Sequence, residues 1–108
     1  MHQNSFEFAD KTVLGWGNRG WLEITDLILR VCEKGALKTH IMYKCNLNSK
    51  QIQQYLDFLL DRHLVERMPE TEDVRRSLYI TTERGKRFMT AYGELAGIFR
   101  MPVNEVEQ

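Results

Sequence analysis

Apolar residues recur at helical spacing in the first clearly patterned stretch of the chain, residues 21–34. The intervals between them are three, three, one, three and one, which places them on one face of an α-helix. These residues are Trp21, Ile24, Leu27, Ile28, Val31 and Cys32. Gly35 follows where a left-handed C-terminal cap would lie, and Lys34 lies against the negative end of the helix dipole. The pattern therefore predicts an amphipathic helix that ends before Gly35.

A short helix and a tight polar turn are predicted next. Residues 36–38 favour a very short strand or link, and Thr39 can cap a helix that begins at His40 and ends at Cys45 or Asn46. The segment Asn46-Leu47-Asn48 then favours a turn, because asparagine tolerates turn conformations, and its leucine is expected to be buried.

A second amphipathic helix is predicted from Ser49 to Arg62. Asn48 or Ser49 can cap it, and Gln51 stands where the reciprocal partner of a capping box belongs. Its buried face is expected to comprise Ile52, Leu56, Leu59 and Leu60, and its opposite face Lys50, Gln53, Gln54, Asp57 and Asp61. A short helix, a tight turn and a second helix form the core of a helix-turn-helix.

Strand signals follow these helices and precede a last helix. Apolar residues alternate from Leu64 to Met68, and strand character returns from Leu78 to Thr81. The polar run between them makes the pair a hairpin, which is a wing when it follows a helix-turn-helix. Thr82 can cap a final helix that runs to about Arg100.

These elements predict an α+β, mostly α fold: a winged helix-turn-helix with a three-helix core, a β-hairpin wing and a C-terminal helix for dimerisation. A chain of 108 residues is the usual size of one domain. We expect four segments: an N-terminal arm over residues 1–20, the winged helix-turn-helix domain over 21–81, the C-terminal helix over 82–101 and an acidic tail over 102–108.

Composition excludes several classes of protein. The chain is 43% hydrophobic and 28% charged, and no apolar run approaches the roughly 20 residues of a membrane-spanning helix. The N-terminus lacks a basic segment followed by an apolar one, so we expect no secretory signal and a cytoplasmic location. Cys32 and Cys45 are too few and too far apart for a zinc site and are expected to be buried, reduced thiols. No metal, cofactor or small-molecule ligand is expected, and no phosphate loop or activated nucleophile suggests an enzyme.

Charge is distributed unevenly although the totals balance. The chain has 15 basic and 15 acidic residues, so its net charge gives no reason to expect nucleic acid. From Lys34 to Leu56, however, Asp and Glu are absent, and the basic side chains are Lys34, Lys38, His40, Lys44 and Lys50. A local positive face of this kind suits contact with phosphates.

Three blocks of the chain carry a more specific pattern. They are GA-x-KT-x-IMY-x-x-NL from Gly35 to Leu47, YL-x-x-LL-x-x-x-L-x-E from Tyr55 to Glu66, and Y-x-x-T-x-x-G from Tyr79 to Gly85. The chain thereby resembles an archaeal winged-helix family that includes small dimeric chromatin-associated proteins and the Arn-type transcriptional regulators. The resemblance implies binding to double-stranded DNA as a homodimer joined through the C-terminal helices.

The chain departs from the pattern of this family at three places. Residues 1–20 have no counterpart in it, and His63 stands where the family often has a glycine. The wing carries Glu70, Glu72 and Asp73, which argues against contact between the wing tip and DNA.

Helix-turn-helix docking places the N-terminal half of the second helix in the major groove. Its solvent-facing residues are therefore the candidates for base contact: Ser49, Lys50, Gln53 and Gln54. Gln can pair with adenine, and Lys can donate to the acceptors of guanine. The alternative is an ordinary solvated helix face.

The candidates for phosphate contact lie around the preceding short helix and on the wing. They are Lys38, Thr39, His40, Tyr43, Lys44, Arg75 and Arg76. Surface charge without a partner is the alternative for the lysines, and a place in the core is the alternative for Tyr43. Arg75 and Arg76 follow the wing acids closely, so weak ion pairs within the wing are the alternative for them.

The last helix carries an aromatic and aliphatic seam at spacings of four, three and four, formed by Phe88, Tyr92, Leu95 and Phe99. We expect this seam to form the dimer interface, although the first helix could cover it within one chain. The leading hypothesis is a homodimeric DNA-binding transcriptional regulator. The alternatives are a protein-interaction module without DNA binding and a nonspecific chromatin-architectural protein.

Overall fold

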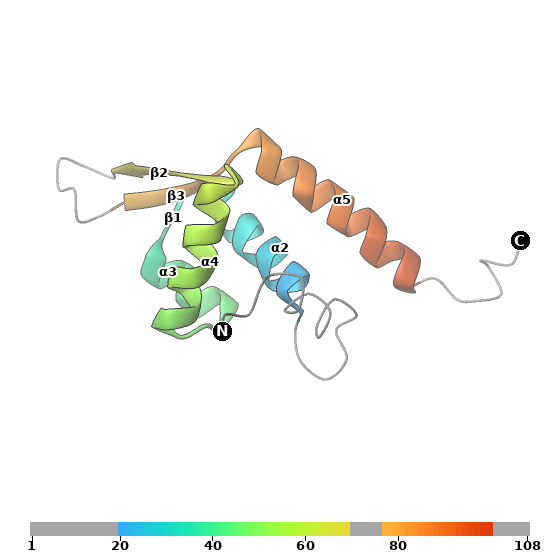
Figure 1. Cartoon of the computed structure of the whole chain (residues 1–108), viewed down its shortest axis with the longest axis horizontal. Coiled ribbons are helices and arrows are strands. Elements are labelled where there is room, and N and C mark those ends of the chain that lie inside the picture. Colours follow the sequence, from blue (N-terminus) through green and yellow to red (C-terminus); the bar gives the residue numbers. More distant parts are fainter. Residues whose placement is uncertain (1–19, 70–76, 101–108) are drawn as a thin grey trace, which may run out of the picture.

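The computed structural model describes residues 20–69 and 77–100 and has the predicted α+β, mostly α winged helix-turn-helix fold. Its helices are α2 (Trp21–Val31), α3 (Lys38–Cys45), α4 (Ser49–Asp61) and α5 (Glu83–Arg100), and its strands are β1 (Ala36–Leu37), β2 (Val65–Pro69) and β3 (Ser77–Thr81). The strands form one antiparallel sheet in the order β1-β3-β2. The β2–β3 hairpin extends away from the helices on one side, and α5 leaves on the other (Figure 1).

The core lies where α2, α3 and α4 meet beneath the sheet. Its largest fully buried aliphatic side chains are Ile28, Leu29, Ile41, Ile52, Leu56, Leu59 and Val65. Leu60, which was expected among them, is only partly buried and packs at the edge of this cluster. Burial of each such side chain stabilises the fold by about 1.5–3 kcal/mol, so the apolar periodicity accounts for the helical arrangement.

Helix α2 is shorter than predicted and is tied to the sheet at its C-terminal end. It ends at Val31 rather than Lys34, and Gly35 has the expected left-handed conformation, with φ of 94°. The Thr81 hydroxyl donates to the Leu29 carbonyl at 2.6 Å, and the Thr81 amide donates to the Cys32 carbonyl at 3.0 Å. The Leu29 and Cys32 carbonyls at the end of α2 therefore bond to β3, and the Cys32 carbonyl also accepts from the Gly35 amide at 3.0 Å.

Helix α3 begins in a different way from the one predicted. It starts at Lys38 after Leu37, no side chain caps it, and Thr39 lies inside its first turn. The expected Thr39 cap is therefore wrong. Leu37 belongs to β1 and pairs with Leu78 of β3, so sheet pairing fixes the point at which the chain turns into the helix.

The turn between α3 and α4 follows the prediction. Asn46 is left-handed, with φ of 57°, and Leu47 is buried. The Gln51 amide donates to Asn48 Oδ1 at 2.8 Å, and the Asn48 amide donates to Gln51 Oε1 at 2.9 Å. This reciprocal pair is the predicted capping box, and it fixes the start of α4.

Both cysteines are buried thiols, as predicted. Burial raises the pKa of the Cys32 thiol to about 12, with a smaller contribution from Cys45. Within residues 20–69 and 77–100, no cluster of three metal-ligating side chains occurs and no helix is long and apolar enough to cross a membrane.

Candidate nucleic-acid interface

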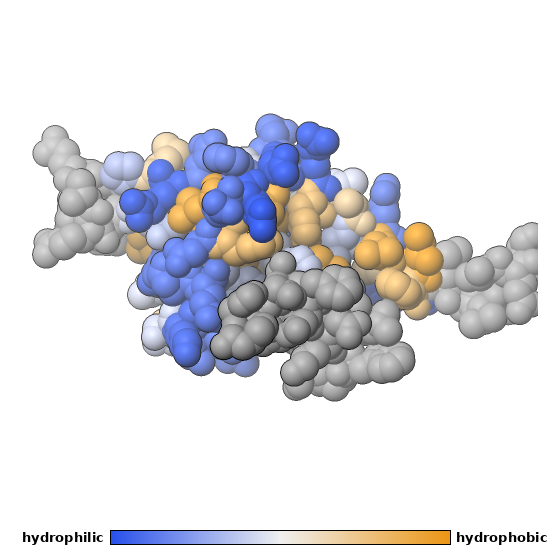
Figure 2. Space-filling model, in the orientation of Figure 1, coloured by the Kyte–Doolittle hydropathy of each residue, from blue (hydrophilic) through white to orange (hydrophobic). Residues whose placement is uncertain are grey.

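The second helix of the pair, α4, displays all four candidates for base contact. Ser49, Lys50, Gln53 and Gln54 are exposed, while Ile52 and Leu56 on the other side of the helix are buried. Hydrophilic residues cover the end of the molecule where Figure 1 places α3 and α4 (Figure 2). The two helices therefore present one continuous polar surface.

One side chain of this surface is held from two sides. Gln53 Oε1 accepts a hydrogen bond from Lys38 Nζ, and Gln53 Nε2 donates to Asp57 Oδ1 at 2.8 Å. Lys38 is the first residue of α3, whereas Gln53 and Asp57 lie one turn apart on α4. The resulting chain of hydrogen bonds joins the two helices across their polar face.

The N-terminus of α3 is electrostatically unsatisfied. Its first turn contains Lys38 and His40 but no acidic residue, and no side chain caps it. A cation at the positive end of a helix dipole is unfavourable by about 0.3–1 kcal/mol. An anion placed there would remove this penalty and could bond to backbone amides of the first turn.

The C-terminal half of α3 exposes Tyr43 and Lys44. The tyrosine is 82% exposed, so the alternative that it belongs to the core is wrong. Its neighbour Ile41 is fully buried and Lys44 is exposed, which leaves the phenol and the ammonium group on the outside of the helix pair. An exposed aromatic ring with a hydroxyl can pack against a sugar and donate to a phosphate.

The predicted wing contacts, Arg75 and Arg76, lie outside the described residues, as do Glu70, Glu72 and Asp73. The predicted N-terminal arm up to residue 19 and the tail from residue 102 also lie outside them.

The seam on α5 divides into a covered part and an exposed part. Phe88 packs against the edge of the core and stacks on Tyr92, with ring centroids 6.4 Å apart. Leu95 and Phe99 are 41% and 62% exposed, and Ile98, which lies outside the predicted seam, is 58% exposed. The hydrophobic patch appears in Figure 2 where the distal end of α5 projects beyond the body. Helix α2 therefore covers only the first half of the seam.

Tyr92 also borders a hollow between α2 and α5 that is lined by charged groups. Arg30 Nε donates to Asp26 Oδ2 at 2.7 Å, and this bond raises the pKa of Arg30. Burial, and then the charges of Glu23 and Asp26, raise the pKa of Tyr92. The hydroxyl of Tyr92 therefore stays protonated beside these carboxylates.

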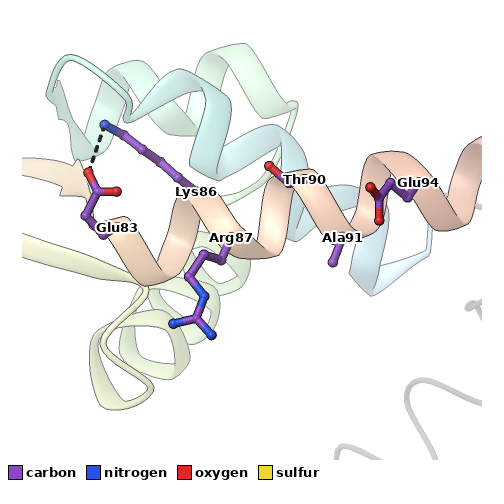
Figure 3. Close-up of a pocket in the computed structure, with 6 residues that line it drawn as sticks. All are labelled: Glu83, Lys86, Arg87, Thr90, Ala91 and Glu94. Atoms are coloured by element: carbon purple, nitrogen blue, oxygen red, sulfur yellow. Dashed lines mark hydrogen bonds and ion pairs between the residues drawn. The ribbon is translucent and has the colours of Figure 1, made fainter.

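A second hollow runs along the outer face of α5 (Figure 3). Its lining residues are Glu83, Lys86, Arg87, Thr90, Ala91 and Glu94. All six lie on one helix, and Lys86 Nζ pairs with Glu83 Oε2 at 3.5 Å. An open face on a single helix with an exposed ion pair is a solvated surface, and no chemistry follows from it.

Comparisons with known proteins agree with this architecture. The sequence profile of a family described as winged helix-turn-helix matches residues 18–99. The structure of Sso10a-2, described as a DNA-binding protein from Sulfolobus solfataricus, is 34% identical, with a TM-score of 0.67 over 74% of this chain and 81% of that one. The chain therefore belongs to the winged helix-turn-helix family.

More distant structures share the fold. The transcriptional regulator BldR from Sulfolobus solfataricus is 19% identical, with a TM-score of 0.68 over 94% of this chain and 69% of that one. A mutant of MepR from S. aureus, bound to an oligodeoxyribonucleotide, is 17% identical, with a TM-score of 0.59 over 83% of this chain and 71% of that one. No curated protein sequence matches the chain.

Proposed function

We propose that this protein is a winged-helix transcriptional regulator that binds double-stranded DNA as a homodimer, with α4 in the major groove. The observation that carries the proposal is the joint surface of α3 and α4, which is exposed, polar and free of acidic residues up to Asp57. The 34% identity to Sso10a-2, described as a DNA-binding protein, supports the same conclusion.

Base contact is assigned to the exposed N-terminal half of α4. In this assignment Lys50 donates to guanine O6 or N7, and Gln53 and Gln54 pair with adenine edges. Ser49 lies in the first turn of α4, where its hydroxyl can bond to either kind of base. The capping box at Asn48 supports this assignment because it holds the first turn of the helix rigid.

Phosphate contact is assigned to α3. Its uncapped N-terminus, with Lys38, Thr39 and His40, offers backbone amides and positive charge together. Tyr43 and Lys44 provide a second contact at the other end of this helix. Arg75 and Arg76 are proposed as further phosphate ligands from the wing.

Dimerisation is assigned to the exposed part of α5. Leu95, Ile98 and Phe99 form an apolar patch at the projecting end of the helix, and burial against a second copy would remove it from water. Two copies related by a two-fold axis would suit a palindromic site. The proposal also assigns residues 21–81 to the winged helix-turn-helix domain and residues 82–101 to a separate dimerisation element.

Titration of a fluorescent duplex at two salt concentrations tests the proposal. Affinity should fall steeply with salt, with a slope of about −0.9 for each phosphate contacted. Lys50→Glu should abolish binding, whereas Lys86→Glu, the same charge change on the outer face of α5, should leave it nearly unchanged. Undetectable affinity at low salt would refute DNA binding, and equal affinity of the Lys50→Glu variant would refute the placement of α4 in the major groove.

Two alternatives make different predictions. The balanced total of 15 basic and 15 acidic residues favours a protein-interaction module, which would dimerise or capture a partner without affinity for DNA. A chromatin-architectural protein would use the same surface without sequence preference. Competition between a selected duplex and random duplex distinguishes this role from regulation, because only a regulator should prefer the selected sequence strongly.

A further inference from the structure

The hydrogen bonds around Gln53 leave its amide group with one fixed orientation. A glutamine amide has two acceptor sites on oxygen and two N–H donors on nitrogen. Lys38 Nζ occupies one acceptor site and Asp57 Oδ1 accepts from one N–H. If the amide were turned by half a revolution, its nitrogen would face the ammonium group and its oxygen would face the carboxylate, and both contacts would be repulsive.

Among residues 20–69 and 77–100, no other group bonds to the second acceptor site or the second N–H of Gln53. The oxygen and nitrogen of one amide are neighbours, so these two groups can engage the same base, and the side chain is exposed on the polar face of α4. In the major groove, adenine presents an acceptor at N7 next to a donor at the N6 amino group. The free N–H of Gln53 matches N7, and the free acceptor site matches the amino group.

We propose that Lys38 and Asp57 are positioning residues that orient the amide of Gln53 to read adenine. This inference rests on the proposed function, because it concerns the same surface and the same ligand. It gives Lys38, for which the sequence predicts phosphate contact, a second role. A lysine has three N–H donors, so the two that Gln53 does not use can bond to a neighbouring DNA phosphate. Lys38 would then contact the DNA backbone and orient the base-reading side chain at the same time.

Gln54 provides an internal comparison. It is exposed on the same helix, but it makes no side-chain hydrogen bond within residues 20–69 and 77–100. Its amide is free to turn and can present either edge to a base. Adenine preference should therefore depend on Gln53 more strongly than on Gln54.

The first experiment needs no DNA. In the ¹⁵N NMR spectrum of the full chain, the side-chain amide of Gln53 should have a higher order parameter than that of Gln54. Both Lys38→Met and Asp57→Ala should lower the order parameter of Gln53 towards that of Gln54. Lys44→Met, which also removes a lysine from α3, should not. Equal order parameters for the two glutamines, or no change in either positioning variant, would overturn the inference.

The second experiment measures discrimination between bases. A duplex is first selected from a random library with the wild-type chain, and each adenine in it is then replaced in turn. A bidentate contact from glutamine should give about 5- to 150-fold discrimination at one adenine. Gln53→Ala, Lys38→Met and Asp57→Ala should each reduce this ratio, whereas Lys44→Met should weaken binding equally to all the duplexes.

The two positioning variants have opposite effects on overall affinity. Lys38→Met removes a positive charge and should weaken binding to random duplex, and Asp57→Ala removes a negative charge and should strengthen it. A shared loss of discrimination therefore cannot arise from charge alone. If Gln53→Ala reduces discrimination while both positioning variants keep it, this inference fails and the proposed function stands. If the wild-type chain does not bind duplex, both fail.

Discussion

The hydroxyl of Thr82 donates a hydrogen bond to the carbonyl of His63 at 2.7 Å. This bond joins the end of β3 to the turn that precedes β2, and the same hydroxyl accepts from the Gly85 amide at 3.0 Å to cap α5. His63 is left-handed, with φ of 60°, which explains why glycine would suit its position. One side chain therefore ties the first turn of α5 to the turn that precedes β2.

Gly85 has no room for a side chain in this corner. A Cβ atom there would lie 2.3 Å from the Leu64 carbonyl oxygen and 2.6 Å from Thr81 Cγ2. Gly85→Ala should therefore lower the free energy of unfolding by about 1–3 kcal/mol, the usual effect of overpacking, as measured by urea denaturation. Gly93→Ala is the matched control on the same helix, because nothing lies within 4 Å of its added Cβ. It should stabilise the protein by up to about 1 kcal/mol, and destabilisation by both variants to the same degree would contradict this account.

The two expected helix caps should respond differently to substitution. Asn48→Ala removes the acceptor of a 2.8 Å capping bond and should lower the free energy of unfolding by about 1 kcal/mol. Thr39→Ala should change it by less than about 0.5 kcal/mol, because no side chain caps α3. Thermal and urea unfolding of the two variants measure this difference. If Thr39→Ala lowers the free energy of unfolding as much as Asn48→Ala does, Thr39 caps α3 after all.

Dimerisation should depend on the exposed part of the α5 seam. Phe99 is 62% exposed, so Phe99→Asp should leave the domain folded by circular dichroism while shifting sedimentation equilibrium towards the monomer. Thr90→Asp places the same charge on the outer face of α5 (Figure 3) and should leave the association unchanged. If the wild-type chain sediments as a monomer at micromolar concentration, this patch is not a dimer interface.

The buried thiol of Cys32 should be unreactive in the native state. Its pKa is raised to about 12 by burial, so the thiol keeps its proton at pH 8 and thiolate is nearly absent. Ellman's reagent should therefore react slowly with the folded protein and fully in denaturant. The same shift makes the stability of the fold decrease as the pH rises from about 9 towards 12, because the unfolded chain loses this proton first. Rapid labelling under native conditions would contradict the burial of Cys32.

Several features of the fold followed from short-range sequence signals. The apolar intervals of α2 and α4, the glycine at position 35 and the pair Asn48 and Gln51 each act within one or two helical turns. Their outcome depends on neighbouring residues in the chain, so periodicity and capping chemistry were enough to predict the winged helix-turn-helix and the exposed face of α4.

The remaining features depended on residues far apart in the sequence. Pairing of Leu37 with Leu78 sets the start of α3 at Lys38 and not at His40. Packing of α2 against α5 covers Phe88 and leaves Phe99 exposed. The bond from Lys38 to Gln53 exists only because the turn brings α3 against α4. Which residues could form helices and a polar surface was predictable from the amino-acid sequence, because those preferences are local. Which groups meet was not predictable in this way, because strand pairing, helix packing and contacts across the turn join segments that no short sequence window contains.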